Sequence, residues 1–462
     1  MTAALARWFR STVRTPRRPG GPGLPPGPRL PALLQTVLWA AAPARFGKVC
    51  LRRYGPLFTT RILGFGTVVY ISTPEGIRRI LRDDADNFDA AAANESIRFV
   101  VGEHSLLMSD GAAHADRRRA LMRPLHGENV AAYVEVMVSI VEQEVRRWRE
   151  GSTVRLLDCF QRVTIEVMIR AVFGITDSSR LDRLRVLVPR LLDLNPVIIL
   201  LPAMRRSFGG FGPWVAFQRI LREVDEIIFA EIRERRAALA ADPDSRGADV
   251  LSHLLAGQDR VPATDREVRD HLVTLLAVGQ ETAATQLAWF FERVLRTPGA
   301  LARVRDAVRD EDWKVLDAAI HESIRVRPTT LDIGRIAVGP WESDGYVFPA
   351  GTMFAVSLGL LHLSEDLHAD PETYSIERFH PAGPPSAHFL PFGGGNHRCL
   401  GASLAIVEMR TVISTILRDV RLAVRRPAPE RVVPKGPMLV PRRGAEVVVV
   451  HNQLTTRSPG RR

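Results

Sequence analysis

One cysteine of this chain, Cys399, stands where it could bind a metal ion. It follows three consecutive glycines, which allow backbone turns that residues with side chains resist. An apolar pattern at helical spacing begins just after it, at Leu404. Cys399 should therefore lie where a glycine-rich loop enters a helix, so that free backbone N–H groups and the helix dipole stabilise a thiolate. Such a thiolate is a strong, soft ligand for iron.

Two other interpretations of this loop are a buried structural cysteine and the glycine loop of a nucleotide site. A structural cysteine does not account for the glycines. In a nucleotide site, small residues should meet the phosphate where His397 and Cys399 stand, and no strand–loop–helix unit is evident.

A long central helix could supply a second group of reactive side chains. Thr264 and Glu267 form a capping-box pattern, and Pro298-Gly299 should end the helix that begins there. The segment between is apolar nearly all round, which is typical of a helix buried through the centre of a protein. A glycine within such a helix costs about 0.5–1 kcal/mol relative to alanine, so Gly279 suggests that something large and flat approaches the backbone.

Next to this glycine, Glu281 and Thr282 bring an acid and a hydroxyl into the same helix. Both groups are costly to bury unless they have partners. They could manage protons in a reaction. The alternative is a bent core helix in which Glu281 forms a salt bridge.

The loop resembles the haem-binding signature of the cytochrome P-450 superfamily. Phe392, Gly395, His397, Cys399 and Gly401 fill every slot of that signature. The resemblance implies that Cys399 is the thiolate ligand of the iron of haem b, and that Phe392, Gly393 and Gly401 also contact the cofactor.

The central helix is similar to the oxygen-binding motif of the same superfamily. The resemblance implies that the Thr282 hydroxyl steadies bound dioxygen, that Glu281 relays protons and that Gly279 lies beside the haem. Two departures are Val278 in place of a small residue, which could narrow the groove over the haem, and Ala283 in place of a hydroxyl.

A further pair of segments resembles the ion-pair triad of the superfamily. Glu322 and Arg325 stand at i and i+3 of a predicted helix, and Arg378 follows in a Glu-Arg-Phe segment. Alone, the first pair would be an ordinary surface ion pair. Together, the resemblance implies a buried triad that braces the haem loop.

Haem carries two carboxylates that need cationic or donor partners. The resemblance implies that His114 and Arg118, one helical turn apart, hold them together with Arg335 and His397. Asp116 stands where the family often has an arginine, so one contact could be missing. Neighbouring arginines form either a solvated basic face or, with Arg398, a docking face for an acidic electron donor; they are Arg117, Arg119 and Arg123.

The composition, 46% hydrophobic and 25% charged over 462 residues, is that of a soluble globular protein. The net charge of +12 comes largely from basic ends, with six arginines and no acid in residues 1–30, so we expect no nucleic-acid partner. Residues 1–20 are either a basic amphipathic helix on an anionic membrane or a disordered tail. We expect no transmembrane span. Three distant cysteines fit a reducing, cytoplasmic compartment, with Cys50 and Cys159 as inert core residues.

The expected fold is mainly α with a minor β-sheet region, and the resemblance implies the cytochrome P-450 fold with the long central helix over the haem. Helices are expected at 75–82, 113–122, 128–149, 160–173, 180–194, 213–240, 265–296, 299–309 and 312–326. A hairpin should span 57–72, and short strands 331–356. Residues 1–23 and 451–462 should be tails around a single haem-thiolate catalytic domain, 24–450.

The resemblance, with a bacterial and actinobacterial character, implies a monooxygenase that inserts one oxygen atom of O2 into an apolar small molecule. The chain has no flavin or iron–sulfur motif, so electrons should come from a ferredoxin and its reductase. We expect an apolar cavity with few charges and a greasy entrance at 195–202. A haem-thiolate isomerase or dehydratase, or a non-enzymatic haem sensor, remain as alternatives.

Overall fold

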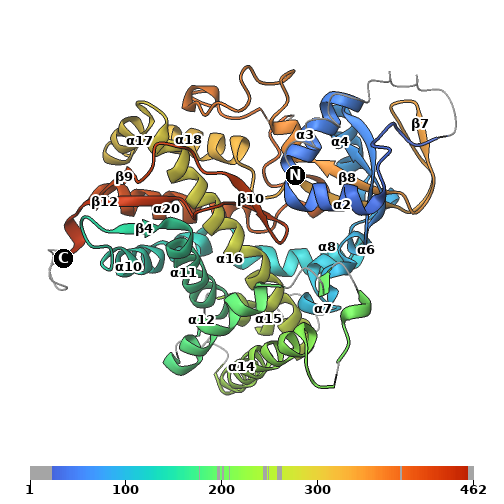
Figure 1. Cartoon of the computed structure of the whole chain (residues 1–462). Helices are drawn as coiled ribbons and strands as arrows, with labels where there is room; N and C mark the ends of the chain where they lie inside the picture. The colour runs from blue at the N-terminus through green and yellow to red at the C-terminus, as the bar shows by residue number, and fades with distance from the viewer. Residues whose placement is uncertain are drawn as a thin grey trace.

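The computed structural model describes residues 23–455, apart from 176, 195–197, 200–201, 208, 243–246, 248, 257–262 and 386–387. The predicted basic tail at 1–23 and most of the predicted entrance at 195–202 therefore lie outside the described residues. The described part is mainly helical, with small sheets, as the sequence predicts (Figure 1).

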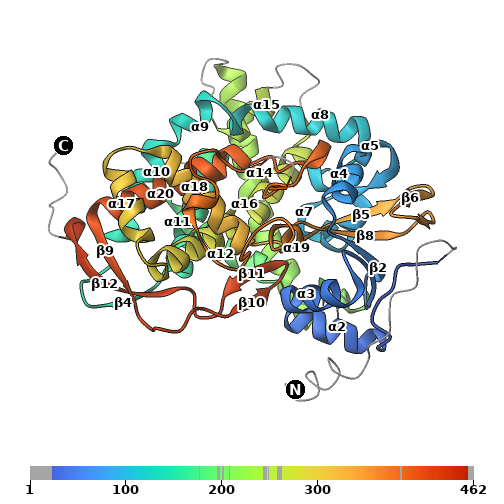
Figure 2. The ribbon, with the colours of Figure 1, turned by 90° about the horizontal axis from the view of Figure 1, so that it is seen from above.

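The helix α16 (Asp265–Arg296) runs through the centre of the molecule (Figures 1 and 2). It begins at the predicted capping box, in which the Glu267 N–H donates to Thr264 Oγ1 (3.2 Å) and the Thr264 N–H donates to Glu267 Oε2 (2.8 Å). It ends before Gly299, which takes a left-handed φ of 76°. Side chains such as Leu287 and Phe290 are fully buried, so the prediction of a buried central helix is confirmed.

Three helices that matter for the site surround α16: α11 (Leu156–Met168), α18 (Trp313–Val326) and α20 (Ala402–Asp419). Side-chain caps begin several helices, with Thr73 before α4, Asp177 before α12 and Asp312 before α18. The other helices are α2 (Ala32–Ala41), α3 (Pro43–Tyr54), α4 (Pro74–Arg82), α5 (Asp84–Asn87), α6 (Ala90–Ala93), α7 (Arg98–Val101), α8 (Gly111–Met122), α9 (Glu128–Ala132), α10 (Val134–Val145), α12 (Ser178–Leu192), α14 (Pro213–Ala241), α15 (Val250–Ala256), α17 (Ala300–Arg309) and α19 (Leu358–His362).

The largest sheet has the strand order β1-β2-β8-β5-β3. β1 (Leu57–Ile62) and β2 (Gly66–Ile71) form the predicted hairpin, and β2 pairs in parallel with β8 (Met353–Ser357). β5 (Asp332–Ala337) pairs antiparallel with β8 and with β3 (Phe88–Asp89). The smaller sheets consist of β6 (Trp341–Ser343) with β7 (Tyr346–Phe348), β10 (Val432–Lys435) with β11 (Met438–Pro441), and β4 (Thr153–Arg155), β12 (Glu446–Asn452) and β9 (Val420–Val424).

Several elements of the structure differ from the sequence prediction. The predicted helix 128–149 is divided into α9 and α10, and the helices α2 and α3 were not predicted. The strands β9 to β12 were not predicted either. Because β12 continues to Asn452 and a 3₁₀ turn spans Gln453–Thr455, regular structure continues beyond the predicted boundary at 450.

Within the described ranges, one helical segment, Gly395–Asp419, is long and apolar enough to cross a membrane. In this protein 67% of its apolar stretch is buried, and α20 packs against α10, α16 and α18. It is therefore a core helix.

Candidate active site

The loop before α20 needs its glycines for two different reasons. Gly393 and Gly395 take left-handed φ values of 69° and 64°. In addition, a Cβ atom on Gly395 would lie 2.2 Å from the backbone oxygen of Leu81 at the end of α4. The loop therefore packs against α4 so closely that only glycine fits at 395.

The thiol of Cys399 lies just before the start of α20. The Cys399 N–H donates to the Phe392 carbonyl oxygen (2.8 Å), which closes the loop. The side chain is accessible, whereas Cys50 and Cys159 are buried, as predicted for inert core residues. Burial by the surrounding protein raises the pKa of the Cys399 thiol, although the Gly401 N–H and the charges of Arg118 and Arg398 act in the opposite direction. A bound metal cation would add positive charge beside the sulfur and so favour the thiolate.

Two of the predicted carboxylate-binding residues lie side by side. The rings of His114, on α8, and His397, in the loop, have centroids 3.9 Å apart. Burial, with the nearby charges of His397 and Arg118, lowers the pKa of His114 to about 4, so this imidazole is neutral at pH 7. His397 Nε2 lies 2.9 Å from Asp110 Oδ1. Burial alone would raise the pKa of Asp110, but hydrogen bonds from His397 and the Ala91 N–H hold it well below its usual range.

Arg118 lines the same cavity as His114 and His397, whereas the guanidinium of Arg335 is paired with Asp84. Arg118, His114 and His397 line one cavity of about 620 Å³. Arg335 is buried, and its guanidinium forms a two-pronged ion pair with Asp84 and donates to the Gly334 carbonyl oxygen (2.7 Å). Three of the five N–H donors of Arg335 are thus occupied, which leaves two for another carboxylate. The partner Asp84 carries no signal in the sequence.

The predicted triad is confirmed. Glu322 and Arg325 are fully buried, and Arg325 donates to both Glu322 oxygens (2.7 and 2.8 Å). Its remaining N–H groups donate to the backbone oxygens of His362, Pro371 and Thr373, so all five donors are used. Arg378 Nε donates to Glu322 Oε1 (3.1 Å). The triad therefore ties α18 to the segment 362–378 that precedes the loop.

Gly279 packs closely against the helix α11. A Cβ atom at this position would lie 2.9 Å from Cε of Met168 on α11, so the glycine permits close packing of two helices. This contact is one reason for a glycine at this position of the helix.

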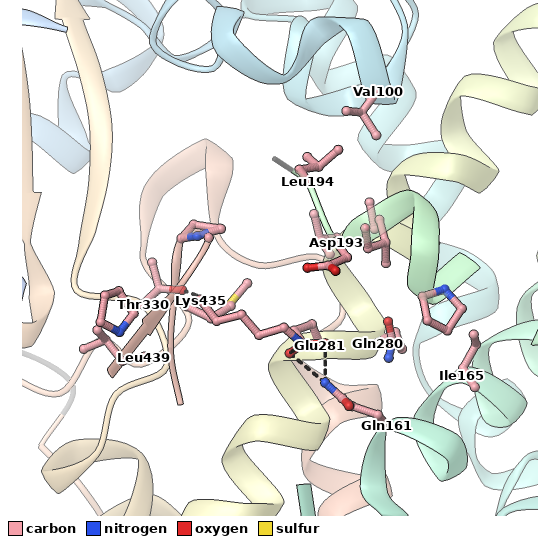
Figure 3. Close-up of a pocket in the computed structure, with 18 of the residues that line it drawn as sticks. Val100, Gln161, Ile165, Asp193, Leu194, Gln280, Glu281, Thr330, Lys435 and Leu439 are labelled. Atoms are coloured by element: carbon pink, nitrogen blue, oxygen red, sulfur yellow. Dashed lines mark hydrogen bonds and ion pairs between the residues drawn. The ribbon is translucent and has the colours of Figure 1, made fainter. Parts of the chain in front are cut away.

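Glu281 and Thr282 point to different partners. The Thr282 hydroxyl donates to the Val278 carbonyl oxygen of its own helix (2.8 Å). The Glu281 carboxylate accepts hydrogen bonds from Gln161 Nε2 on α11 (2.9 and 2.8 Å) and lies 3.0 Å from Lys435 Nζ at the end of β10 (Figure 3). Neither Gln161 nor Lys435 belongs to a motif, so sequence analysis did not find them.

A cavity of about 1220 Å³ lies beside this part of α16 (Figure 3). The apolar side chains that line it include Val100, Leu194, Val278 and Leu331. The expectation of few charges is wrong. Charged side chains from α10, α11 and α12 also line the cavity, and many of them neutralise one another, such as Arg162 with Glu144 (3.0 Å) and Arg185 with Glu166 (2.7 Å).

The residues present fit haem b. Cys399 offers one accessible sulfur, and the Cβ position of Gly401 has no atom within 4 Å, so space remains beside the sulfur. A cation and two imidazoles around one cavity, from Arg118, His114 and His397, suit the two carboxylates of the cofactor. Among the described residues no cluster of three or more His, Cys, Asp or Glu could hold a free metal ion.

Comparisons with known proteins agree with this chemistry. The family model described as cytochrome P-450 matches residues 22–449. The chain is 38% identical to cytochrome P-450 135B1 of Mycobacterium tuberculosis over 92% of this chain and 91% of that protein. It is 33% identical to cytochrome P-450 135A1 of the same species, over 93% and 95%.

A solved structure, the cyanobacterial CYP120A1 with retinoic acid bound, superposes with a TM-score of 0.77 at 23% identity. The match covers 93% of this chain and 99% of that one. This likeness shows the fold.

Proposed function

The chain belongs to the cytochrome P-450 family, and on this premise we propose a substrate class, an electron donor and a role for each residue of the site. Proteins of this family are haem-thiolate monooxygenases, which use haem b, an organic substrate, O2 and electrons from a redox partner. The bound haem supplies the activation of O2, from which one oxygen atom enters the substrate.

Residues of this chain hold the cofactor and handle protons. Cys399 would ligate the haem iron through its sulfur, and His114, Arg118 and His397 would hold the haem carboxylates, with the two remaining donors of Arg335 available to them. The Thr282 hydroxyl donates to Val278 and keeps its lone pairs free to accept a proton. Glu281, between Thr282 and the charged side of the cavity, passes protons from water to this hydroxyl.

The substrate is an apolar molecule of considerable size. The observation that carries this proposal is the cavity of about 1220 Å³, whose apolar side chains adjoin Val278 and Glu281 of α16. Typical ligand pockets measure roughly 300–1,000 Å³. Retinoic acid, the ligand of the cyanobacterial neighbour, is a molecule of this kind.

The electron donor is a small acidic protein of the ferredoxin type. Arg119, Arg123 and Arg398 are exposed around the mouth of the haem loop, and their positive charge would speed the approach of an acidic partner. Reduction by such a ferredoxin should slow markedly as the salt concentration rises. Reduction rates that ignore salt would contradict this assignment.

The protein is cytoplasmic and touches a membrane at one face. The exposed side of α2 presents Leu33, Leu34 and Val37, next to Leu63. These residues directly follow the arginine-rich N-terminal tail, and a basic segment beside an apolar face suits an anionic membrane. Trp39 and Ala40 of the same helix line the cavity, so an apolar substrate could enter from the lipid. Equal binding to vesicles with and without anionic lipid would contradict this contact.

The optical spectrum of the reduced protein with carbon monoxide tests the proposal. A strongly red-shifted Soret band that disappears in Cys399→Ala is expected for a thiolate ligand. Apolar compounds that shift the iron spin state, and are then oxidised in the presence of ferredoxin and its reductase, would identify substrates. Turnover without any electron donor would favour an isomerase or dehydratase. Haem binding with neither spin-state shifts nor turnover would favour a sensor.

A further inference from the structure

The carboxylate of Glu281 is held from both sides of the central helix. Gln161 on α11 donates its amide to both carboxylate oxygens (2.9 and 2.8 Å), and Lys435 at the end of β10 contacts Oε1 (3.0 Å), as Figure 3 shows. Only 15% of the Glu281 side chain is exposed. In the part of the chain that the structure describes, no hydrogen bond joins Glu281 to Thr282. Gln161 and Lys435 therefore hold the Glu281 carboxylate away from the Thr282 hydroxyl, to which we propose it passes protons.

Lys435 belongs to a hairpin that lines the cavity. The hairpin is formed by β10 and β11, and residues 434–439 all face the cavity. The strand β11 is fixed close to the turn, because the Leu439 N–H donates to the Thr329 oxygen (2.8 Å) and the Leu439 oxygen accepts from Trp289 Nε1 (2.8 Å). The turn consists of Gly436, with a left-handed φ of 56°, and a proline, which has no N–H to donate. Lys435 pairs with Met438 in the ladder beside this turn, so its backbone is held in place and its long side chain is the part that can move.

The contact between Lys435 and Glu281 is suited to being broken and remade. The Lys435 side chain is 45% exposed, and exposed ion pairs contribute little because water competes for both charges. A molecule that fills the cavity touches the hairpin on one side and Val278 and Glu281 on the other. Such a molecule would separate the ammonium group from the carboxylate.

We propose that Gln161 and Lys435 are positioning residues for Glu281, and that occupation of the cavity breaks the Lys435 contact. Without substrate, the two residues hold the carboxylate across the groove between α11 and the hairpin. With substrate, the Lys435 side chain moves toward solvent, and Glu281, still bound to Gln161, turns toward water and Thr282. Proton supply then follows substrate binding. This inference rests on the proposed role of Glu281 in proton transfer.

A double-mutant cycle on ligand binding tests the coupling. The probe is clotrimazole, a bulky apolar imidazole whose binding shifts the Soret band. Because binding must break the ion pair in the natural protein, Lys435→Met should lower the Kd about threefold. In a Glu281→Gln background the same substitution should have no such effect. Any gain from the apolar methionine itself occurs in both backgrounds and cancels in the cycle.

Two matched variants separate position from charge. Lys435→Arg keeps the ion pair and should restore the natural Kd. Arg442→Gln removes one exposed positive charge just after this hairpin without touching Glu281 and should leave the Kd unchanged. An effect of Lys435→Met that is equal in both backgrounds, or absent in both, would overturn the inference.

Oxygen consumption in the absence of substrate gives a second measurement. With ferredoxin and reductase present, Lys435→Met should raise substrate-free O2 consumption about threefold, and Glu281→Gln should abolish the increase. The carbon monoxide spectrum of each variant is recorded first. A variant with the thiolate spectrum but no coupling refutes only the positioning role, whereas loss of the thiolate spectrum in the natural protein refutes the proposed function itself.

Discussion

The imidazole Nε2 of His362 accepts a hydrogen bond from the backbone N–H of Leu390 at 3.0 Å. The carbonyl oxygen of the same histidine accepts from Arg325 Nη1 (2.9 Å), so a buried chain of bonds runs from the triad to the residue just before the haem loop. Burial, aided by the charges of Arg325 and His368, lowers the pKa of His362 to about 3. The His362 ring is therefore neutral, as it must be for Nε2 to accept the hydrogen bond from the Leu390 N–H.

Removal of the Glu322 carboxylate should break this chain of hydrogen bonds and destabilise the protein. Glu322→Ala leaves the charge of Arg325 buried without a counter-ion, and we expect the free energy of unfolding to fall by about 3–5 kcal/mol. Arg325→Lys should be nearly as damaging, because a lysine has three donors for five acceptor contacts. Urea unfolding of both variants measures the loss. Asp306→Ala, which removes an exposed ion pair with Arg309, is the control and should change stability by less than about 1 kcal/mol.

The contact between Gly395 and Leu81 predicts a difference between two neighbouring glycines. Gly393 and Gly395 share a left-handed backbone, but only Gly395 would bring a Cβ against the Leu81 oxygen. Gly393→Ala should therefore weaken the protein moderately, by about 1 kcal/mol, while Gly395→Ala also displaces the loop and lowers the haem content of the purified protein. The ratio of haem to protein absorbance checks this. Equal haem content in the two variants would contradict the role of the Leu81 contact.

Arg118 should retain the cofactor, whereas its neighbour Arg119 should not. Both arginines border the cavity with His114 and His397, but the side chain of Arg119 is exposed and already pairs with Asp116 (3.3 Å). We expect haem to transfer from Arg118→Met to apomyoglobin about tenfold faster than from the natural protein, since a charged hydrogen bond is lost, equivalent to roughly 1.4 kcal/mol. Transfer from Arg119→Met should be unchanged. A similar increase in both variants would indicate a general charge effect.

A buried acid in α20 predicts how stability depends on pH. Burial raises the pKa of Glu408 to about 8 from an ordinary value of 4.5, and its Oε1 atom has no hydrogen-bond partner. The folded protein therefore holds a proton that the unfolded chain releases between these two values, so this group's contribution is complete below pH 4.5 and is lost as the pH rises to about 8.

Glu408→Gln should remove this dependence. As the pH rises from 5 to 8, the natural protein should lose stability relative to Glu408→Gln. The free energy of unfolding of the variant should exceed that of the natural protein by up to about 1.4 kcal/mol more for each pH unit. Thermal unfolding across this range measures the trend. Parallel curves for the two proteins would show that Glu408 is not protonated in the fold.

The sequence predicted the parts of the site that depend on local pattern. The triad and the capped central helix were correct because spacing along one helix, or a segment with a distinctive order of residues, carries that information. Contacts that the tertiary fold creates were missed. Met168 packs against Gly279, Gln161 and Lys435 reach Glu281 from distant elements, and Asp84 of the short helix α5 pairs with Arg335. No sequence motif around Asp84 or Lys435 predicts that Asp84 pairs with Arg335 or that Lys435 contacts Glu281.

The main sheet also has a consequence for how the chain is made. Val68 of β2, near the beginning, pairs with Met353 of β8, and β5 completes the same sheet. During synthesis, the open edge of the β1–β2 hairpin stays unpaired until most of the chain, including β8, has been synthesised. A fragment that stops before β8 would expose this edge, and the remaining fragment would lack β2, the partner of β8. We therefore expect neither half of this protein to be obtainable as a soluble, separately folded product.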